Sequence, residues 1–413
     1  MKYGLIGNPL EHSYSPNIHA LFGNQDYQLY PLLADNLVSF LQEADFHGLN
    51  VTIPYKKAVL PYCVLSPKAQ EIGSVNTILN QNGRLEGHNT DYSGFLYLAQ
   101  RTGVNFYGQK VLILGNGGAA QTVKTAAGDK GAKEIIIVSR LGENNYQNIH
   151  EHYDANILIN TTPVGMFPDN YSCPADLTPF YNLKHVLDLI YNPLNTVLTQ
   201  AATTKGIANA SGLAMLVAQA WYAHKLFFNI TSNVHQDEQT IEKAVNIMER
   251  RLKNLIIIGM PGCGKTTLGN HLAKKLNRPF IDTDLKIQEE TGRTPSEIIQ
   301  SNGEDAFRNI ESQIISTVTK KTGQVIAIGG GGVLYEKNRS ALRQNGWVIY
   351  LDAPLEELDI KGRPLSASPA ALAQMEPIRR PIYQALANQT IFSGKNKAAG
   401  IQAVVRLFKE LPL

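Results

Sequence analysis

Residues 259–267 (GMPGCGKTT) constrain the fold of this chain more than any other part of its sequence. Residues 255–258 (LIII) form a short apolar, β-branched run that predicts a buried strand, and residues 268–276 (LGNHLAKKL) follow with a helical pattern. A strand, a glycine loop and a helix in this order are the context in which G-x-x-x-x-G-K-T predicts a phosphate-binding loop. The glycines let backbone N–H groups point inward, and the helix adds its positive end. The sequence therefore predicts a nucleoside triphosphate site.

Two side chains of this loop have predicted roles of their own. Lys265 can reach the β- and γ-phosphates of a nucleotide, and the Thr266 hydroxyl can bind Mg²⁺. The alternative is a glycine-rich turn with an unrelated lysine. The residues predicted to contact the nucleotide are Gly259, Gly262, Cys263, Gly264, Lys265, Thr266 and Thr267.

The composition limits what kind of chain this is. With 413 residues it is too long for one ordinary hydrophobic core, so we expect two or three domains. Hydrophobic residues make up 43% and charged residues 18%, which is typical of soluble globular proteins, and we predict no membrane-spanning segment. The net charge of +3 predicts no nucleic-acid-binding surface. Three scattered cysteines and a start without signal-peptide features favour the reducing cytoplasm.

Polar clusters near the start of the chain are candidates for a substrate site. Ser13 and Ser15 stand two residues apart on a predicted turn before a helix, where they either donate to one carboxylate or cap the helix. Residues 48–53 predict a strand that delivers Thr52 and, beyond a proline, Lys56. Lys56 is either a functional cation or an ordinary surface charge.

Further polar residues follow in the first half of the chain. Asn76 lies in the segment GSVNT, and Asp91 lies in GHNTDYSG just before a predicted helix, where an aspartate commonly caps the N-terminus. Gln219 is the single amide in a mostly apolar helix predicted over residues 212–221. It is either a satisfied core group or a ligand contact.

A second glycine turn follows the apolar strand predicted over residues 111–114. Residues 115–120 (GNGGAA) fit G-x-G-x-x-A, a turn that binds the pyrophosphate of a dinucleotide at the start of a helix. An NAD-specific site places an acidic residue after the next predicted strand, whereas Ser139 and Arg140 stand here. An arginine suits the 2′-phosphate of NADP, and the alternative is a surface arginine at a strand end. We therefore predict NADP(H) as the cofactor.

Downstream of the phosphate loop, residues 279–284 (PFIDTD) predict a strand whose end carries Asp282 and Asp284 on one face. Asp282 is expected nearer to the Mg²⁺ ion bound by Thr266, and Asp284 can accept the proton of an attacking hydroxyl. The alternative is a polar strand exit without a catalytic role.

The rest of the second half contains two further features, a run of glycines after a strand and a segment bounded by arginine motifs. The strand predicted over residues 325–328 ends in four glycines, which let a substrate approach the backbone closely. Residues 362–365 (GRPL) predict the start of a mobile lid, which residues 379–383 (RRPIY) close.

The first half carries a series of motifs that occur together in one enzyme family. HSYSP, NVTIPYK, VNT, NTDYSG, GNGGAA, INTTPVGM, DLIYNP and GLAML with its later glutamine occur in order over residues 1 to about 250. Together they resemble the shikimate dehydrogenase family. The resemblance implies a substrate domain, a central Rossmann domain and a return of the chain to the first domain. It also implies NADPH-dependent reduction of 3-dehydroshikimate to shikimate.

This resemblance implies roles for individual residues. Lys56 and Asp91 are the implied catalytic pair, in which the lysine supplies a proton to the alkoxide that hydride transfer leaves. The residues implied to bind the substrate are Ser13, Ser15, Thr52, Asn76, Asp91, Tyr191 and Gln219. The residues implied to bind the cofactor are Gly115, Asn116, Gly117, Gly118, Ala119, Ala120, Ser139, Arg140, Thr161 and Gly212.

The nucleotide-binding part departs from the family pattern in two places. Asn116 stands where alanine is usual, and Ser139-Arg140-Leu141 replaces the family's Asn-Arg-Thr. There is also no clear second basic residue just downstream. The preference for NADP over NAD is therefore expected to be weaker than in typical members.

Residues 255–413 resemble the shikimate kinase family through GMPGCGKT, FIDTD, FRNIE, GGGG, RPL and R-x-P-I-Y in order. The resemblance implies that MgATP is the phosphoryl donor and that arginines pair with the shikimate carboxylate. Arg363 is implied to contact the nucleotide and to stabilise the transferring phosphate, beside the catalytic Lys265 and Asp284. The residues implied to bind shikimate are Asp284, Arg308, Gly330, Gly331 and Arg379.

We therefore predict an α/β chain with three domains. An N-terminal α/β substrate domain (residues 1–100, completed by 210–252) is followed by a Rossmann NADP-binding domain (101–209). A phosphate-loop kinase domain of the nucleoside monophosphate kinase type, with a parallel sheet, covers residues 253–413. Only residues 253–254, without a Gly/Ser/Pro-rich composition, separate the last helix predicted for the dehydrogenase (236–252) from the first kinase strand, which favours a restricted junction between the two enzymes.

The predicted function is bifunctional: reduction of 3-dehydroshikimate to shikimate, then phosphorylation of the shikimate 3-hydroxyl, both steps of aromatic amino-acid biosynthesis. The product of the first reaction is the substrate of the second, so each half supports the other. One alternative is a quinate/shikimate dehydrogenase of broader specificity fused to the kinase. Another is a non-catalytic regulator that binds pathway metabolites, although Lys56, Asp91, Lys265 and Asp284 are all present. The sequence leaves the oligomeric state undetermined.

Overall fold

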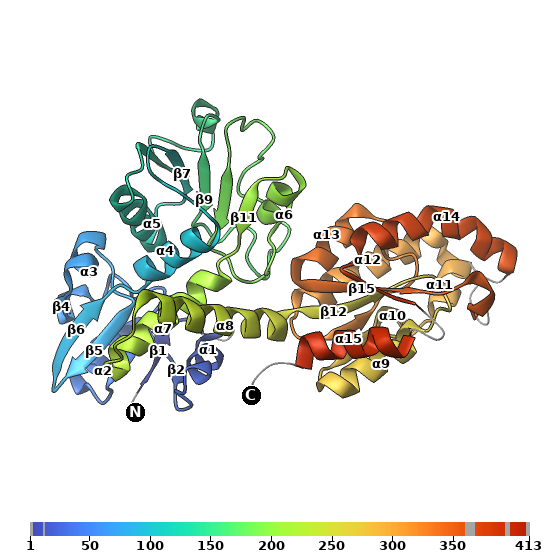
Figure 1. Cartoon of the computed structure of the whole chain (residues 1–413), viewed down its shortest axis with the longest axis horizontal. Coiled ribbons are helices and arrows are strands. Elements are labelled where there is room, and N and C mark those ends of the chain that lie inside the picture. Colours follow the sequence, from blue (N-terminus) through green and yellow to red (C-terminus); the bar gives the residue numbers. More distant parts are fainter. Residues whose placement is uncertain (1–2, 11–12, 360–367, 393–396, 410–413) are drawn as a thin grey trace. The chain divides into compact units, whose positions relative to one another are not determined.

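The computed structural model describes residues 3–10, 13–359, 368–392 and 397–409. These residues form a mixed α/β chain with three sheets, as the sequence predicted (Figure 1). The chain packs as two compact units, one made of residues 1–192 and 198–248 and the other of residues 193–197 and 249–413. Within the described segments, no helix is both long and apolar enough to cross a membrane.

The first sheet of the first unit is six-stranded and mixed, in the order β2-β1-β3-β5-β6-β4. Its strands are β1 (Tyr3–Gly7), β2 (Gln28–Pro31), β3 (Gly48–Val51), β4 (Val64–Leu65), β5 (Thr77–Gln81) and β6 (Arg84–His88). β1 and β3 are parallel, and β5 runs antiparallel to both β3 and β6. The hairpin between β5 and β6 turns at Asn82 and Gly83, which both have positive φ angles, as a tight hairpin requires.

Short helices connect these strands over a buried core. They are α1 (Ser15–Leu21), α2 (Leu37–Glu43) and α3 (Pro67–Ile72), with 3-10 turns η1 (Ala34–Asn36) and η2 (Leu60–Tyr62). The core includes Ile6, Leu41, Leu49, Val75 and Ile78, each at most 2% exposed. Because the strands alternate, the other face of β3 and β5 carries the polar residues of the site.

The second sheet is parallel and five-stranded, in the order β11-β10-β9-β7-β8. Its strands are β7 (Lys110–Leu114), β8 (Glu134–Val138), β9 (Ile157–Asn160), β10 (His185–Asp188) and β11 (Ala208–Ala210). It is accompanied by α5 (Gly118–Asp129), η3 (Ile149–His152) and α6 (Val197–Thr204). Continuous apolar strands fit a parallel sheet covered on both faces, and the Rossmann prediction is confirmed.

Three longer helices complete the first unit and lead out of it. They are α4 (Asp91–Arg101), α7 (Leu213–Phe228) and α8 (Val234–Leu252). α4 and α7 lie side by side (Figure 1), and Gly94 permits this, because a Cβ there would collide with the Met215 carbonyl and with Gln219. The close packing sets Gln219 near the start of α4.

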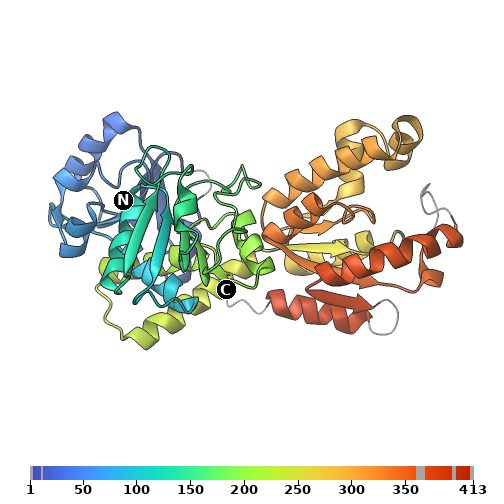
Figure 2. The same cartoon turned by 90° about the horizontal axis from the view of Figure 1, so that it is seen from above.

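The second unit has a parallel five-stranded sheet in the order β13-β14-β12-β15-β16. Its strands are β12 (Asn254–Ile258), β13 (Phe280–Asp282), β14 (Val325–Ala327), β15 (Gly346–Asp352) and β16 (Gln389–Phe392). Its helices lie on both faces of the sheet (Figure 2). They are α9 (Lys265–Leu276), α10 (Thr283–Thr291), α11 (Pro295–Asn302), α12 (Glu304–Lys320), α13 (Glu336–Asn345), η4 (Leu355–Glu357), α14 (Pro369–Leu386) and α15 (Lys397–Lys409).

One prediction about this unit is wrong in detail. Asp284 does not lie on a strand with Asp282, because Asp282 caps α10 by accepting the Asp284 N–H at 3.0 Å, and the helix starts at Thr283. Residues 379–383, which are predicted to close the lid, lie within α14. Residues 362–365, which are predicted to open it and include Arg363, lie outside the described residues.

The chain passes from the first unit to the second within α8. Arg278, on the loop after α9, donates to the carbonyls of Arg250 and Lys253, both at 2.6 Å. Burial lowers the pKa of the Arg278 guanidinium to about 10. The last turn of α8 therefore belongs physically to the second unit.

Candidate active sites

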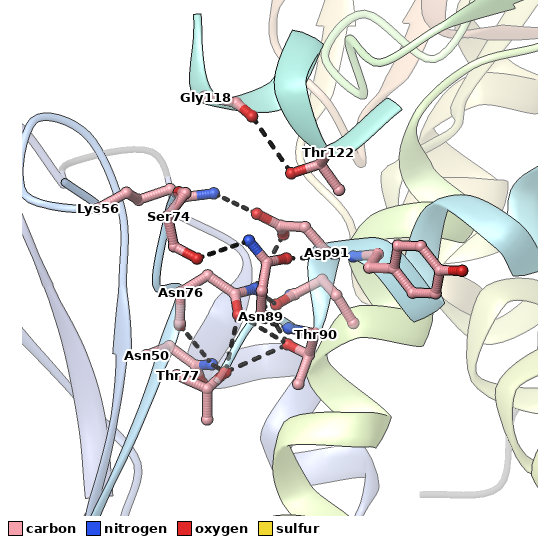
Figure 3. A network of polar contacts seen from close by, with 12 residues as sticks. Asn50, Lys56, Ser74, Asn76, Thr77, Asn89, Thr90, Asp91, Gly118 and Thr122 are labelled. Atoms are coloured by element: carbon pink, nitrogen blue, oxygen red, sulfur yellow. Dashed lines mark hydrogen bonds and ion pairs between the residues drawn. The ribbon is translucent and has the colours of Figure 1, made fainter. Parts of the chain in front are cut away.

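The first site is built around an ion pair between two loops. Lys56 follows β3 and Asp91 starts α4, and Lys56 Nζ lies 2.5 Å from Asp91 Oδ2 (Figure 3). Their side chains are 24% and 11% exposed, so both remain accessible from one side. Thr90, not Asp91, is the N-cap of α4, so the capping interpretation of Asp91 is wrong. The interpretation of Lys56 as an unpaired surface charge is also wrong.

Two amides converge on this pair. Asn76 Nδ2 donates to Asp91 Oδ1 at 2.9 Å, and it lies 3.4 Å from Gln219 Oε1. Gln219 in turn donates to the Leu216 carbonyl at 2.8 Å. The structure therefore brings together Asn76 just before β5, Asp91 at the start of α4 and Gln219 on α7, although up to 143 positions separate them.

The two serines lie at the start of α1 as predicted. Ser13 Oγ is 3.2 Å from Ser15 Oγ and also accepts the Ser15 N–H at 3.2 Å. Tyr14 between them contacts Tyr191, with ring centroids 5.7 Å apart, so Tyr191 lies close to the serines. Thr52 lies just beyond β3, where its N–H bonds to the Ile6 carbonyl at 2.9 Å. Two hydroxyls on one turn form a plausible donor pair for a carboxylate.

The dinucleotide turn connects β7 to α5. Gly115 has φ +102°, and a Cβ there would collide with the Thr161 hydroxyl, so only glycine fits. Gly117, the N-cap of α5, has open space around its Cα, and it is exposed together with Asn116. This leaves the helix N-terminus and its N–H groups free to approach a pyrophosphate.

The other residues predicted for the cofactor fall into two groups. Gly118, Ala119 and Ala120 form the first turn of α5. Thr161 and Gly212 are used by the protein itself: Thr161 Oγ1 donates to the Leu114 carbonyl at 2.7 Å, and Gly212 N–H donates to the Ile190 carbonyl at 2.8 Å. Both residues thus tie loops to neighbouring strands.

Ser139 and Arg140 follow β8, at the end of the sheet that faces the start of α5. Ser139 is buried and its N–H donates to the Asn144 carbonyl at 3.0 Å, whereas Arg140 is exposed. Leu141 is fully exposed, at 100%. Of the two residues predicted to bind the 2′-phosphate, Arg140 therefore has the more exposed side chain.

The second site contains the phosphate loop, between β12 and α9. Gly262 and Gly264 have φ angles of +80° and +91°, which glycine adopts without strain. Lys265 is buried, and its Nζ donates to the carbonyls of Gly259 and Met260, both at 3.0 Å. The side chain therefore folds back over the loop, as a phosphate-binding lysine must. Cys263 is also buried, while Thr266 and Thr267 are exposed.

The residues for Mg²⁺ fit the ion. Thr266 Oγ1 lies 2.6 Å from Asp282 Oδ2, so a hydroxyl and a carboxylate oxygen meet beside the phosphate loop. Mg²⁺ favours such oxygen ligands together with water and nucleotide phosphates. The described residues contain no cluster of three or more His, Cys, Asp or Glu side chains that could hold a metal alone.

A buried charged cluster lies next to the phosphate loop. Arg308 on α12 and Arg379 on α14 are 5% and 6% exposed, and Arg308 Nη1 donates to Glu311 Oε2 at 2.6 Å. Burial raises the pKa of the Glu311 carboxyl to about 7, against the opposing effect of Arg308, and the nearby Asp284 adds to the rise. Glu311 Oε1 has no hydrogen-bond partner in the described structure.

The glycines after β14 line this cluster. The space that a Cβ of Gly331 would need is filled by the Arg308 guanidinium, and a Cβ of Gly329 would meet both Asp284 Oδ1 and Glu311 Oε1. The Gly330 carbonyl accepts a hydrogen bond from Tyr383 Oη at 2.5 Å. Gly331 therefore lies against the Arg308 guanidinium, and Gly330 lies beside Pro261 of the phosphate loop.

The motifs FRNIE and R-x-P-I-Y contain Glu311 and Tyr383, but the sequence predicts no role for the Glu311 carboxylate or the Tyr383 hydroxyl. The spacing of Glu311 three residues after Arg308 on a helix was the available signal, because side chains three apart share a face.

Comparisons with known proteins support both families that the motifs indicate. The family model described as the shikimate dehydrogenase substrate binding domain matches residues 5–78, and the shikimate kinase model matches residues 261–410. The shikimate dehydrogenase (NADP(+)) of Clostridium perfringens is 35% identical over 263 residues, which cover 58% of this chain and 97% of the relative.

Solved structures give the same result for the first unit. A chorismate mutase/shikimate 5-dehydrogenase fusion protein from Clostridium acetobutylicum matches with 32% identity and a TM-score of 0.54, over 58% of this chain and 95% of that one. Shikimate 5-dehydrogenase from Thermus thermophilus, solved with NADP(H) and shikimate, matches with 30% identity and a TM-score of 0.52, over 59% and 99%. The chain belongs to the shikimate dehydrogenase family and continues into a shikimate kinase domain, which makes it a bifunctional enzyme of the shikimate pathway.

Proposed function

We propose that the Lys56–Asp91 pair carries the proton chemistry of the reduction. NADPH supplies the hydride, and its addition to the ketone carbon leaves an alkoxide oxygen that needs a proton. Lys56 Nζ donates this proton, and Asp91 holds the ammonium group in place through the 2.5 Å contact. That contact, made beside the amides of Asn76 and Gln219, is the observation that carries the proposal.

The other residues of the first site bind and orient. The hydroxyls of Ser13 and Ser15, beside Tyr191, hold the substrate carboxylate. Thr52, Asn76 and Gln219 bind its hydroxyls, for which amides and hydroxyls can act as both donors and acceptors. The α5 N-terminus binds the pyrophosphate of the cofactor, and Arg140 binds the 2′-phosphate.

In the second site, the buried arginines bind the product of the first. Arg308 and Arg379 pair with the carboxylate of shikimate, and Asp284 accepts the proton of its 3-hydroxyl. Lys265 and Thr266, with Mg²⁺ held by Thr266 and Asp282, orient the nucleotide phosphates. Arg363, which lies outside the described residues, stabilises the transferring phosphate.

We assign the substrate domain to residues 1–100 with 210–252, the Rossmann domain to residues 101–209 and the kinase domain to residues 253–413. We also place the protein in the cytoplasm. The three cysteines are all free thiols, which supports a reducing compartment. Fractionation of cells into soluble cytoplasm and other compartments, followed by both enzyme assays, checks this placement.

The proposed function is tested by supplying purified protein with 3-dehydroshikimate, NADPH and MgATP. We expect NADPH oxidation and formation of shikimate 3-phosphate, each dependent on its own cofactor. Comparing shikimate with quinate, and NADP⁺ with NAD⁺, in the reverse direction tests the broader dehydrogenase. A protein that binds both substrates but turns over neither contradicts the proposal.

A further inference from the structure

A buried polar cluster lies behind Asn76, away from the open side of the site. Asn50 on β3, Thr77 on β5 and Thr90 before α4 are each at most 5% exposed. Buried polar groups are costly unless they are hydrogen-bonded, so the partners of this cluster are informative. The reaction described above uses Asn76 and Asp91 but gives Asn50 and Thr77 no role.

The orientation of the Asn76 amide is fixed by two partners, one of which can only donate a hydrogen bond and the other only accept one. The Thr90 backbone N–H donates to Asn76 Oδ1 at 2.7 Å, and the Asp91 carboxylate accepts from Asn76 Nδ2 at 2.9 Å. A flipped amide would set a donor against a donor and an oxygen against a carboxylate. The amide therefore presents its NH₂ group to Asp91.

The orientation of the Asn50 amide follows from the same logic. Asn50 Nδ2 donates to the Asn76 carbonyl at 3.3 Å and to Thr77 Oγ1 at 3.1 Å. Asn50 Oδ1 accepts from Tyr27 Oη at 2.8 Å, and it lies 3.1 Å from His19 Nε2. Because a carbonyl only accepts, His19 must carry its hydrogen on Nε2. Burial lowers the pKa of His19 to about 3, so the ring is neutral.

These bonds form a chain of donors that ends at the Asp91 carboxylate, and Figure 3 shows the part of it between Asn50 and Asp91. His19 and Tyr27 donate to Asn50, and Asn50 donates to Thr77. Thr77 Oγ1 donates to Asn76 Oδ1 at 3.1 Å, Asn76 donates to Asp91, and Lys56 donates to the other oxygen of that carboxylate. Hydrogen bonds aligned in one direction polarise and strengthen one another in a buried environment.

We propose that Asn50 and Thr77 are positioning residues for the reduction, which hold the Asn76 amide against Asp91 and thereby keep the carboxylate turned toward Lys56. The inference rests on the proposed roles of Lys56 and Asp91. It differs from a purely structural role, in which the cluster stabilises the sheet but does not affect turnover by the folded enzyme.

The test is Thr77→Val in the full chain, because valine keeps the shape and removes the hydroxyl. The Thr90 N–H still holds Asn76, so we expect kcat for 3-dehydroshikimate to fall by about tenfold rather than to vanish. The rate is expressed per NADPH-binding site, titrated by fluorescence. We expect KM for NADPH to stay unchanged, because the dinucleotide turn lies on the other sheet. Thr77→Ser, which restores a hydroxyl, should return kcat to within about twofold.

Two further variants grade and control the effect. Tyr27→Phe removes one donor from the outer end of the chain, and we expect kcat to fall by about two- to threefold. Thr102→Val is the matched control, because Thr102 ends α4 and its hydroxyl bonds only to the Leu98 carbonyl at 2.8 Å among the contacts described. This control should turn over as the parent does.

The outcomes separate this inference from the proposed function. Full kcat in Thr77→Val, or a loss that Thr77→Ser does not recover, overturns the positioning role. If Thr77→Val does not fold, Tyr27→Phe decides: a lowered kcat supports the inference and an unchanged kcat overturns it. Full activity in Lys56→Ala would instead overturn the proposed catalytic pair itself.

Discussion

The two active sites hold their charged groups in different surroundings. In the first unit, Lys56 and Asp91 sit at the edge of a network of neutral amides and hydroxyls, with one side accessible. In the second, Arg308, Glu311 and Arg379 are almost fully buried together. The first arrangement orients one ion pair through neutral groups, whereas the second depends on a balance of buried charges.

This difference matches the chemistry that each site performs. A reduction needs one proton delivered to one oxygen. Neutral amides and hydroxyls around the ion pair fix the orientation of the proton donor without adding charge to the site. A phosphoryl transfer develops negative charge on several oxygens and needs concentrated positive charge. The comparison predicts that the first site is sensitive to geometry and the second to protonation.

The largest effect is expected from Lys56→Ala. Loss of a positioned proton donor should lower the dehydrogenase kcat by roughly 10²–10⁴-fold, while the shikimate kinase rate stays as in the parent. Separate assays of the two activities on one preparation measure this. Lys57→Ala, an exposed neighbour, is the matched control and should retain both activities. Loss of both activities in Lys56→Ala would show that the two sites are not independent.

The mirror experiment in the second unit is Asp284→Asn. Removing the acceptor of the hydroxyl proton should lower the kinase kcat by about 10²-fold or more and leave NADPH oxidation unchanged. Asp305→Asn, on the exposed start of α12, controls for the loss of a nearby carboxylate. A kinase rate equal to that of the control would exclude Asp284 as the proton acceptor.

A smaller effect is expected on the pH dependence of the stability of the second unit, through the buried Glu311 carboxyl. The pKa of Glu311 is raised from 4.5 to about 7 by burial, so the folded state binds a proton that the unfolded state has released. The resulting stabilisation is complete below pH 4.5 and is lost as the pH rises through 7, by about 3 kcal/mol at most. Hydrogen exchange of β12 and β15 between pH 5 and pH 8, corrected for intrinsic rates, reads the stability of this unit.

Glu311→Gln provides the comparison for this measurement. Glutamine keeps the shape and does not titrate, so the decline between pH 5 and pH 8 should largely disappear. An equal decline in the variant and the parent would assign the pH dependence to other groups. The first unit serves as an internal reference within each sample.

Several residues of both candidate sites can be predicted from the sequence because each lies in a local motif. Lys56, Asp91, Lys265 and Arg308 could be placed from a strand, a turn or a helix and its neighbours. The direction of the hydrogen bonds behind Asn76 could not be predicted, because Asn50 and Tyr27 join it from strands and loops distant along the chain.

The errors have equally local causes. Alternation alone predicts Asp284 on a strand, because it does not show that Asp282 accepts the Asp284 N–H and starts a helix. The burial of Glu311 does not follow from the sequence, because a glutamate on a helix is usually exposed, and the packing of α12 against the glycine loop buries it. A local motif therefore predicts which residues are present at a site, whereas their burial depends on the tertiary packing.

The smallest effect is expected in the loop after β8, where Arg140 is proposed to bind the 2′-phosphate of the cofactor. Leu141 is fully exposed beside Arg140, so its replacement should cost the fold little. In Leu141→Thr a hydroxyl joins the guanidinium near the 2′-phosphate, and we expect the ratio of kcat/KM for NADP⁺ over NAD⁺ to rise by about threefold. Leu141→Ala removes the same apolar surface without adding a donor and should leave the ratio unchanged. Equal ratios in the two variants would mean that Arg140 alone sets the preference.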